Sequence, residues 1–150
     1  MIAVVQRVKR ASVDVEDPPH HAEIETGLLV LLGVEEGDTE LQSHWMAGKI
    51  AKLRIFRDDQ ERMNHSVLDI GGEVLVVSQF TLAGDCSRGH RPSFVRAADP
   101  TVAECLYEQV VRQLRDDHDL PVGTGVFGGM MQVELVNDGP VTIILRSDDD

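Results

Sequence analysis

The chain has 150 residues, of which 42% are hydrophobic and 27% charged, and its net charge is −12. These totals predict one domain over residues 1–150 with a single core. They disfavour a protein that coats DNA, because the summed field repels phosphate. No apolar run approaches the roughly 20 residues of a membrane helix, and the N-terminus lacks the layout of a signal peptide. Two cysteines, Cys86 and Cys105, make no disulfide framework, so we expect a cytoplasmic protein. Because no long apolar run is present, we expect no membrane partner.

Three segments open the chain. Residues 2–8 and 12–16 alternate or run apolar, which predicts the first two strands. Residues 17–21 contain two prolines, and because proline cannot donate to a sheet ladder we expect a turn there. Residues 27–34 are apolar at nearly every position, which indicates a central strand covered on both faces.

Two segments carry helix signals. Thr39 and Gln42 stand at capping-box spacing and predict the start of a first helix. Asp99 as a cap and Pro100 at the first helical position predict a second helix, which ends before Pro121. Apolar residues repeat in both at steps of three or four, which predicts one buried stripe on each helix. The stripes are Leu41, Trp45, Met46 or Ala47, Ile50 and Leu53 in the first helix, and Val102, Leu106, Tyr107, Val110, Val111 and Leu114 in the second.

The segment between the helices reads as strands and turns. Residues 54–57 resemble a strand, and residues 58–61 resemble its turn. Residues 66–70 and 73–77 flank Gly71-Gly72, which predicts a hairpin because both turn positions need a positive φ.

The C-terminal part predicts two more strands. The glycine-rich residues 123–129 indicate a turn that needs backbone freedom. Strands are expected over 131–136 and 141–145, joined by Asn137-Asp138-Gly139-Pro140, and residues 146–150 are expected to be a disordered acidic tail. The order of elements predicts a single-domain α/β fold, with a mixed or largely antiparallel sheet and two main helices against it. About eight strands could curl into a barrel-like core, which would remove exposed edges.

One strand ends in polar groups. Val74–Val77 is apolar, and the chain then changes to Ser78, Gln79, Phe80 and Thr81, which we call the polar rim. A buried strand that ends in small polar groups before a loop presents them where a ligand can reach. The simpler interpretation is a strand end that turns its polar side chains to solvent.

Positive charge gathers in one stretch. The stretch between Asp85 and Asp99 contains no carboxylate. It does contain three arginines and one histidine, which are Arg88, His90, Arg91 and Arg96. We call residues 86–98 the cationic segment. Such a chain could grip one short anionic end of a larger molecule but should not coat a duplex.

Several site chemistries find little support in the residue spacing. No arrangement of His, Cys or carboxylates matches a zinc site, so no metal is expected. Ser78 or Thr81 would need a base to act as a nucleophile, and only His90 is close in sequence. Gly139-Pro140 by itself indicates a trans hairpin turn, since only about 5% of such bonds are cis.

Two motifs together carry a resemblance to a known family. Ser78-Gln79-Phe80-Thr81-Leu82 and Asn137-Asp138-Gly139-Pro140-Val141-Thr142 resemble the signature motifs of D-aminoacyl-tRNA deacylases. The likeness runs through nearly the whole chain. It includes 1–12, 27–33, 53–56, 63–64, 66–79 and 91–94.

The resemblance implies a homodimer with a barrel-like α/β fold and no metal or organic cofactor. It implies hydrolysis of the ester that joins a D-amino acid, or glycine, to the 3′ end of tRNA. Gly139 and Pro140, joined by a cis bond, would enter the partner's pocket as a chiral selector, and Arg7 would help to hold their carbonyls. Asn137 would belong to the same substrate-binding group. Ser78, Gln79, Phe80 and Thr81 would line the catalytic floor. The rivals are a nucleic-acid-binding module without chemistry and a hydrolase of small esters with Thr81 as nucleophile.

Overall fold

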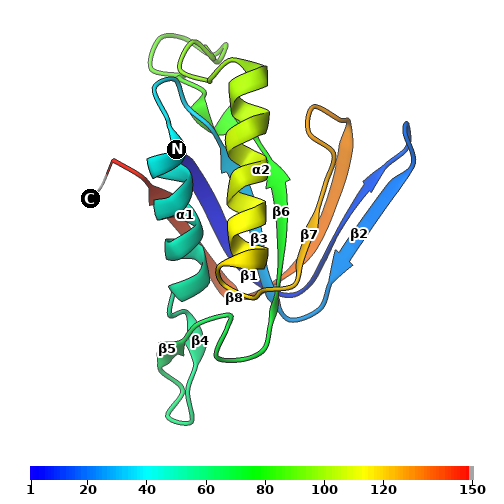
Figure 1. Ribbon diagram of the computed structural model, residues 1–150, viewed down its shortest axis with the longest axis vertical. Coiled ribbons are helices and arrows are strands. Elements are labelled where there is room, and N and C mark those ends of the chain that lie inside the picture. The colour runs from blue at the N-terminus through cyan, green and yellow to red at the C-terminus, as the bar shows by residue number, and fades with distance from the viewer. Residues whose placement is uncertain (149–150) are drawn as a thin grey trace.

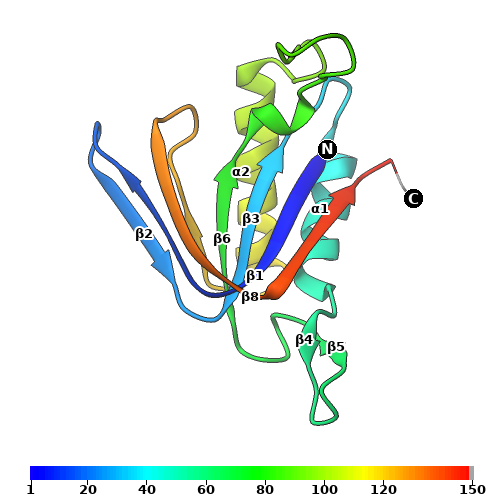
Figure 2. The ribbon, with the colours of Figure 1, turned by 180° about the vertical axis from the view of Figure 1, so that it is seen from behind.

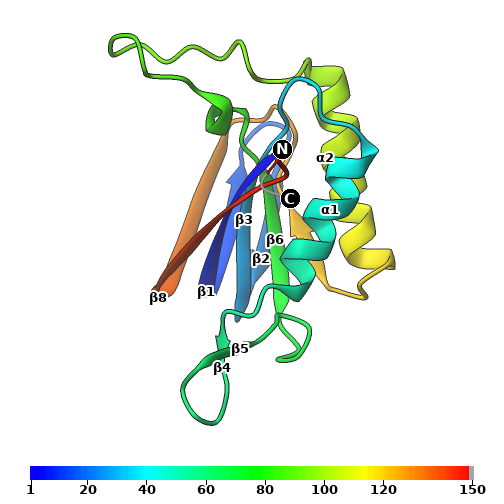
Figure 3. The ribbon, with the colours of Figure 1, turned by 90° about the vertical axis from the view of Figure 1, so that its left-hand side faces the viewer.

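The computed structural model describes residues 1–148, which form one sheet with two helices on one face (Figures 1 and 3). The prediction of an α/β fold with a mixed sheet is confirmed. The strands of the main sheet are β1 (Ile2–Val15), β2 (His20–Ile24), β3 (Gly27–Gly33), β6 (Glu73–Ser78), β7 (Val122–Thr124) and β8 (Met131–Arg146). The other elements are α1 (Glu40–Lys52), α2 (Pro100–Asp116), the 3₁₀ helix η1 (Phe80–Ala83) and a small pair of strands, β4 (Phe56–Arg57) and β5 (Met63–His65).

β1 is the strand on which the sheet is built. One edge of β1 pairs antiparallel with β3 along its first half and with β2 along its second half, and its other edge pairs with β8. The prediction of separate strands over 2–8 and 12–16 is therefore wrong, as is that of separate strands over 131–136 and 141–145. The chain bends instead of breaking, because irregularities in the β1–β8 register between Gln6 and Arg10 absorb the change of direction.

The sheet curls until its edges approach each other, so that the barrel-like core is nearly closed (Figure 2). β2 lies at one end of the strand order and β7 at the other. The His20 ring nitrogen Nε2 lies 2.6 Å from the Thr124 carbonyl oxygen and joins these two ends. His20 and His21 thus belong to a strand, which corrects the turn expected over 17–21, and β7 occupies part of the turn expected over 123–129.

The predicted Gly71-Gly72 hairpin is wrong. Residues 66–70 are a series of turns, and β6 pairs with β3 in parallel. The turns form because Ser66 and Asp69 bond each other: the Ser66 N–H donates to the Asp69 carboxylate at 2.8 Å, and the Asp69 N–H donates to the Ser66 hydroxyl at 3.2 Å. Such local bonds offer the backbone an alternative to a sheet ladder.

Both helices begin where the caps predict. Thr39 and Gln42 form the capping box of α1, and Asp99 accepts a hydrogen bond from the Thr101 N–H at 3.0 Å. The stripes face the core except at their first residues, since Leu41 is 76% and Val102 48% exposed. Trp45 and Leu53 of the first stripe are partly buried. No helix described over residues 1–148 is long and apolar enough to cross a membrane.

The apolar core has two parts. One lies between the helices and the sheet, and includes Val30, Ile50, Val76 and Leu114. The other lies inside the curl, and includes Val13 and Leu75 among the residues of β1, β2, β3 and β6.

The first two residues of the tail expected over 146–150 are bonded to the N-terminal strand or to Met1. Arg146 is the last residue of β8 and pairs with Ile2, which corrects the start of the predicted tail. Ser147 also donates its N–H to the Met1 carbonyl at 3.0 Å. Residues 149–150 of the predicted tail lie outside the described residues.

Candidate active site

The polar rim lies at the end of β6, next to the end of β3. Ser78 is paired with Leu32, and the Gln79 N–H then donates to the Leu32 carbonyl at 2.8 Å. The two strands approach closely there because of Gly33, where a Cβ atom would lie only 2.9 Å from the Gln79 carbonyl oxygen. β6 ends at this point, and the chain turns into η1.

The rim combines hydrogen-bonding groups with an exposed aromatic ring. The Gln79 side-chain amide donates to the Thr81 hydroxyl. Phe80 is 59% exposed, and its ring meets that of Phe94 edge to face, with 5.2 Å between centroids. The contact with Phe94 was not predicted, because nothing in the spacing of the sequence places residue 94 beside residue 80. The only available signal was the inclusion of residues 91–94 in the family likeness.

The rim hydroxyls have no adjacent base. In the part of the chain that the structure describes, residues 1–148, none of the histidine contacts reaches Ser78 or Thr81. The hypothesis of a Ser/Thr–His nucleophile therefore has no support from this geometry.

The second motif forms a turn within β8, residues 138–141, which we call the Gly-Pro turn. The Gly139-Pro140 peptide bond is cis, in contrast to the trans turn that spacing alone indicates. Asn137 holds the turn: its side-chain oxygen accepts from the Val141 N–H at 2.7 Å, and its amide donates to the Val141 carbonyl at 3.2 Å. Gly139 and Pro140 are themselves exposed, so the tip of the turn is free to meet another molecule.

Arg7 supports the Gly-Pro turn from beneath. Its side chain is buried, with 1% exposure, and its Nε donates to the Asp138 carbonyl at 2.9 Å while Nη1 donates to the Ile55 carbonyl at 2.6 Å. The contact is thus with the residue before Gly139 and not with Gly139 or Pro140. Within residues 1–148 the buried Nη2 has no hydrogen-bond partner.

The rim and the Gly-Pro turn lie at opposite ends of the sheet (Figure 2). The register links Ser78 through Leu32 to Ala3, whereas the turn lies opposite Arg7, between the partners of Gln6 and Val8. With about 3.3 Å per residue along a strand and about 4.8 Å between strands, the two motifs of one chain are about 20 Å apart. One small ester cannot touch both.

Comparison with known proteins identifies the family. The family model described as D-Tyr-tRNA(Tyr) deacylase matches residues 4–146. The chain belongs to the D-aminoacyl-tRNA deacylases. The D-aminoacyl-tRNA deacylases of Koribacter versatilis and Chlorobaculum parvum are 59% and 54% identical to it, in alignments that cover 97–98% of every chain. The protein is therefore a deacylase, an ester hydrolase that acts on aminoacyl-tRNA.

Solved structures agree on the fold. The structure named c-Myc DNA Unwinding Element Binding Protein is 42% identical to this chain, and the two superpose with a TM-score of 0.89. The alignment covers 97% of this chain and 98% of the chain in that structure. A probable eukaryotic D-amino acid tRNA deacylase is 17% identical and has a TM-score of 0.77, with 96% and 97% coverage, which supports the barrel-like α/β fold alone.

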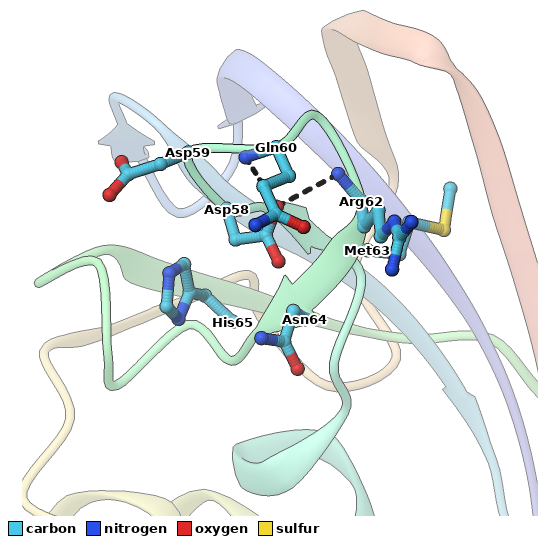
Figure 4. A pocket seen from close by; sticks show the side chains of 7 residues that line it. All are labelled: Asp58, Asp59, Gln60, Arg62, Met63, Asn64 and His65. Atoms are coloured by element: carbon cyan, nitrogen blue, oxygen red, sulfur yellow. Dashed lines mark hydrogen bonds between the residues drawn. The ribbon is translucent and has the colours of Figure 1, made fainter.

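Two hollows of the deacylase lie away from its rim. The larger, about 560 Å³, lies in the β4–β5 hairpin and is lined by Asp58, Arg62 and His65 among others (Figure 4). Backbone N–H groups, that of Arg62 foremost, donate to Asp58 and hold the pKa of its carboxyl below the ordinary value. The smaller, about 220 Å³, lies over β1, β2 and β8. Among residues 1–148, no group of three or more His, Cys, Asp or Glu could hold a metal ion. Neither of these two hollows is lined by a residue of the rim.

Proposed function

We propose that the deacylase removes D-amino acids and glycine from the 3′ end of tRNA and spares L-aminoacyl-tRNA. Its active site is completed by a homodimer, in which the Gly-Pro turn of one subunit covers the polar rim of the other. The observation that carries this proposal is the distance of about 20 Å between the two motifs of one chain, estimated from strand spacing. Phe80 and Thr81 of the rim and Gly139 and Pro140 of the turn are exposed, and on this proposal each motif is half of a site.

The geometry supports a reaction without a protein nucleophile. No histidine within residues 1–148 forms a hydrogen bond with Ser78 or Thr81, whereas the substrate carries a ribose 2′-hydroxyl beside the ester. The backbone N–H groups of Phe80 and Thr81 have no acceptor among residues 1–148, so they are free to stabilise the developing oxyanion. One such donor is worth about 3 kcal/mol in other hydrolases.

Selection works by exclusion. The pocket must accept many D side chains, so it cannot read them by contact. The Gly-Pro turn is small and is held from below by Arg7 and Asn137, so it can contact the substrate's α-ammonium and leave no room for a side chain on the L side. A clash discriminates more strongly than the 1–3 kcal/mol, roughly, of one favourable apolar contact. Glycine has no side chain to exclude, and it is hydrolysed.

The partners and the compartment of the deacylase follow from its substrate. The partners are the aminoacylated end of tRNA and a second copy of the chain, and the compartment is the cytoplasm. The exposed, unpaired Cys86 and Cys105 suit a reducing compartment.

Three substrates test the activity. Purified protein should release the amino acid from D-tyrosyl-tRNA and glycyl-tRNA but not from L-tyrosyl-tRNA, and the rate should persist in chelator. A rate that chelator abolishes and zinc restores would contradict the proposed chemistry. DNA binding with no ester loss would instead favour the binding-module rival, to which the DNA-binding name of one structural neighbour draws attention.

Mixed dimers test the shared site. One subunit would carry Thr81→Trp, which blocks the rim, and the other Gly139→Ala, whose Cβ would lie 2.5 Å from the Val141 nitrogen. If the turn acts on the partner's rim, the mixed dimer has one intact site and regains about half of the wild-type rate with full sparing of L-tyrosyl-tRNA. An active monomer that spares L-tyrosyl-tRNA would rule out the cross-subunit selector.

A further inference from the structure

The cationic segment is fastened to the molecule at its two ends. At its start, Asp85 and Ser93 exchange two backbone hydrogen bonds of 2.8 and 2.9 Å, which close a small loop. At its end, the Arg96 carbonyl accepts from the Glu36 N–H at 2.8 Å, and the Arg96 guanidinium lies 3.1 Å from the Glu35 carboxylate. The Arg96 bonds fix the segment to the loop that follows β3.

The tip of this loop presents unneutralised positive charge. Arg88, His90 and Arg91 are all exposed, and Figure 3 shows the segment projecting from the end of the sheet that carries η1. Neither Arg88 nor Arg91 has a carboxylate partner in the described range, residues 1–148, whereas Arg96 is engaged with Glu35. In a chain of net charge −12, this tip is a local exception to the prevailing field.

The tip is joined to the polar rim through one aromatic contact. Phe94 follows the closed loop directly and meets Phe80 of the rim, with 5.2 Å between ring centroids. A Cβ at Gly84 would lie 3.1 Å from the Phe94 ring, so the glycine lets the chain pass close to this pair. This contact holds the loop that carries the tip next to the rim, so the strand that leads to an ester on the rim can pass along the tip.

We propose that Arg88 and Arg91 bind the phosphates of the single-stranded 3′ end of the tRNA whose ester lies on the same subunit's rim. This inference rests on the proposed function and names the residues that recognise its substrate. The contact is with phosphate, because two exposed guanidiniums on a short loop offer fork-shaped donors but no enclosed surface for a base. It is confined to the strand end, because the acidic remainder of the chain repels a duplex.

The test compares two substrates that share the same ester. D-tyrosyl-tRNA carries the phosphates, and D-tyrosyl-adenosine carries none. Arg88→Gln/Arg91→Gln should lower kcat/KM for D-tyrosyl-tRNA by on the order of tenfold at low salt and leave that for D-tyrosyl-adenosine unchanged. The slope of log(kcat/KM) against log salt should become shallower by about 1.4, which corresponds to two contacts with a single strand.

A control variant removes the same charge elsewhere. Lys49→Gln/Arg112→Gln changes two exposed cations on α1 and α2, the helices that cover one face of the sheet, and should alter kcat/KM for neither substrate (Figure 3). An equal loss of kcat/KM for D-tyrosyl-tRNA in this control would show that the net charge of the protein, and not the position of the two arginines, matters. That result would overturn the proposal. An equal loss on D-tyrosyl-adenosine, or an unchanged salt slope, would also overturn it.

Binding of tRNA that carries no amino acid tests this inference independently of the proposed function. Fluorescence anisotropy should show weaker binding of the Arg88→Gln/Arg91→Gln variant to whole tRNA, and no difference between variant and wild type for tRNA whose single-stranded 3′ end has been removed. An equal difference on the truncated tRNA would indicate duplex contacts and refute the proposal. Failure of the wild-type protein to cleave either ester would refute the proposed function, while the binding result would still decide the role of the tip.

Discussion

Replacement of Arg7 by methionine tests whether one buried guanidinium holds the Gly-Pro turn. Methionine keeps most of the side-chain volume, so the change removes hydrogen bonds without opening a large cavity. The two bonds lost are those to the Asp138 and Ile55 carbonyls, at 2.9 and 2.6 Å. A bond from a charged donor contributes about 1.5–3 kcal/mol, so two contribute about 3–6 kcal/mol.

Part of that loss is recovered. The buried Nη2 of Arg7 has no partner within residues 1–148, and removing such a group regains about 1–3 kcal/mol of desolvation. At the midpoints of these ranges, about 4.5 kcal/mol is lost and about 2 kcal/mol regained, so the expected net loss for Arg7→Met is about 2.5 kcal/mol in the free energy of unfolding, or about 5–10 °C in Tm for a chain of this size. We also expect a larger rate on L-tyrosyl-tRNA relative to D-tyrosyl-tRNA, because the turn loses its support from below.

Urea unfolding followed by circular dichroism measures the stability, and initial rates on the two tRNAs measure the selectivity. Arg10→Met is the matched control, since Arg10 lies on the same strand with an exposed side chain, and its change should stay within about 0.5 kcal/mol. An Arg7→Met protein as stable and as selective as the Arg10→Met protein would refute the reasoning.

Three further outcomes are expected. Thr81→Ala should change kcat on D-tyrosyl-tRNA little, whereas a tRNA that ends in 2′-deoxyadenosine should be a poor substrate; an acyl-Thr81 species trapped in mass spectrometry would contradict this. Asn137→Ala removes the two bonds to Val141 and should cost about 2 kcal/mol in urea unfolding, while Asn137→Asp keeps the acceptor for the Val141 N–H and should cost less. The hydrogen bond to Asp14, followed by that to Glu23, raises the pKa of His21 above 6.5 in the folded protein, so its stabilisation is present at low pH and is lost as pH rises through the folded value. An NMR titration should show this raised midpoint in the wild type and a lower one in Asp14→Asn.

Features that depend on neighbouring residues in the chain could be predicted from the sequence. The capping box at Thr39 and the cap at Asp99 use hydrogen bonds within one helical turn, so their residue types are sufficient evidence. The central strand over 27–34 was predicted because continuous apolar character marks burial on both faces. The first residue of each helical stripe was wrong, because the periodicity does not show where the neighbouring element ends.

Pairing decided the rest of the fold. Gly71-Gly72 carries a hairpin signal, yet β6 pairs in parallel with β3, since the buried faces of Val30 and Val76 find their partners across the sheet and not along the chain. The bend in β1 is likewise a property of the β1–β8 ladder, whose register shifts keep the strand continuous past Lys9.

The two motifs of the site could be recognised in the sequence, but their relation could not. The residues of the polar rim and of the Gly-Pro turn are local, and each motif carries its own signature. Arg7 bridges Ile55 and Asp138, which are 48 and 131 residues away along the chain, and no periodicity encodes a contact of that length. The placement of the rim and the turn at opposite ends of one sheet is a consequence of register, because each step along a strand moves a residue about 3.3 Å. The residue types therefore determined which groups each motif can offer, and only the tertiary structure decided that the two motifs of one chain lie too far apart to contact one small ester.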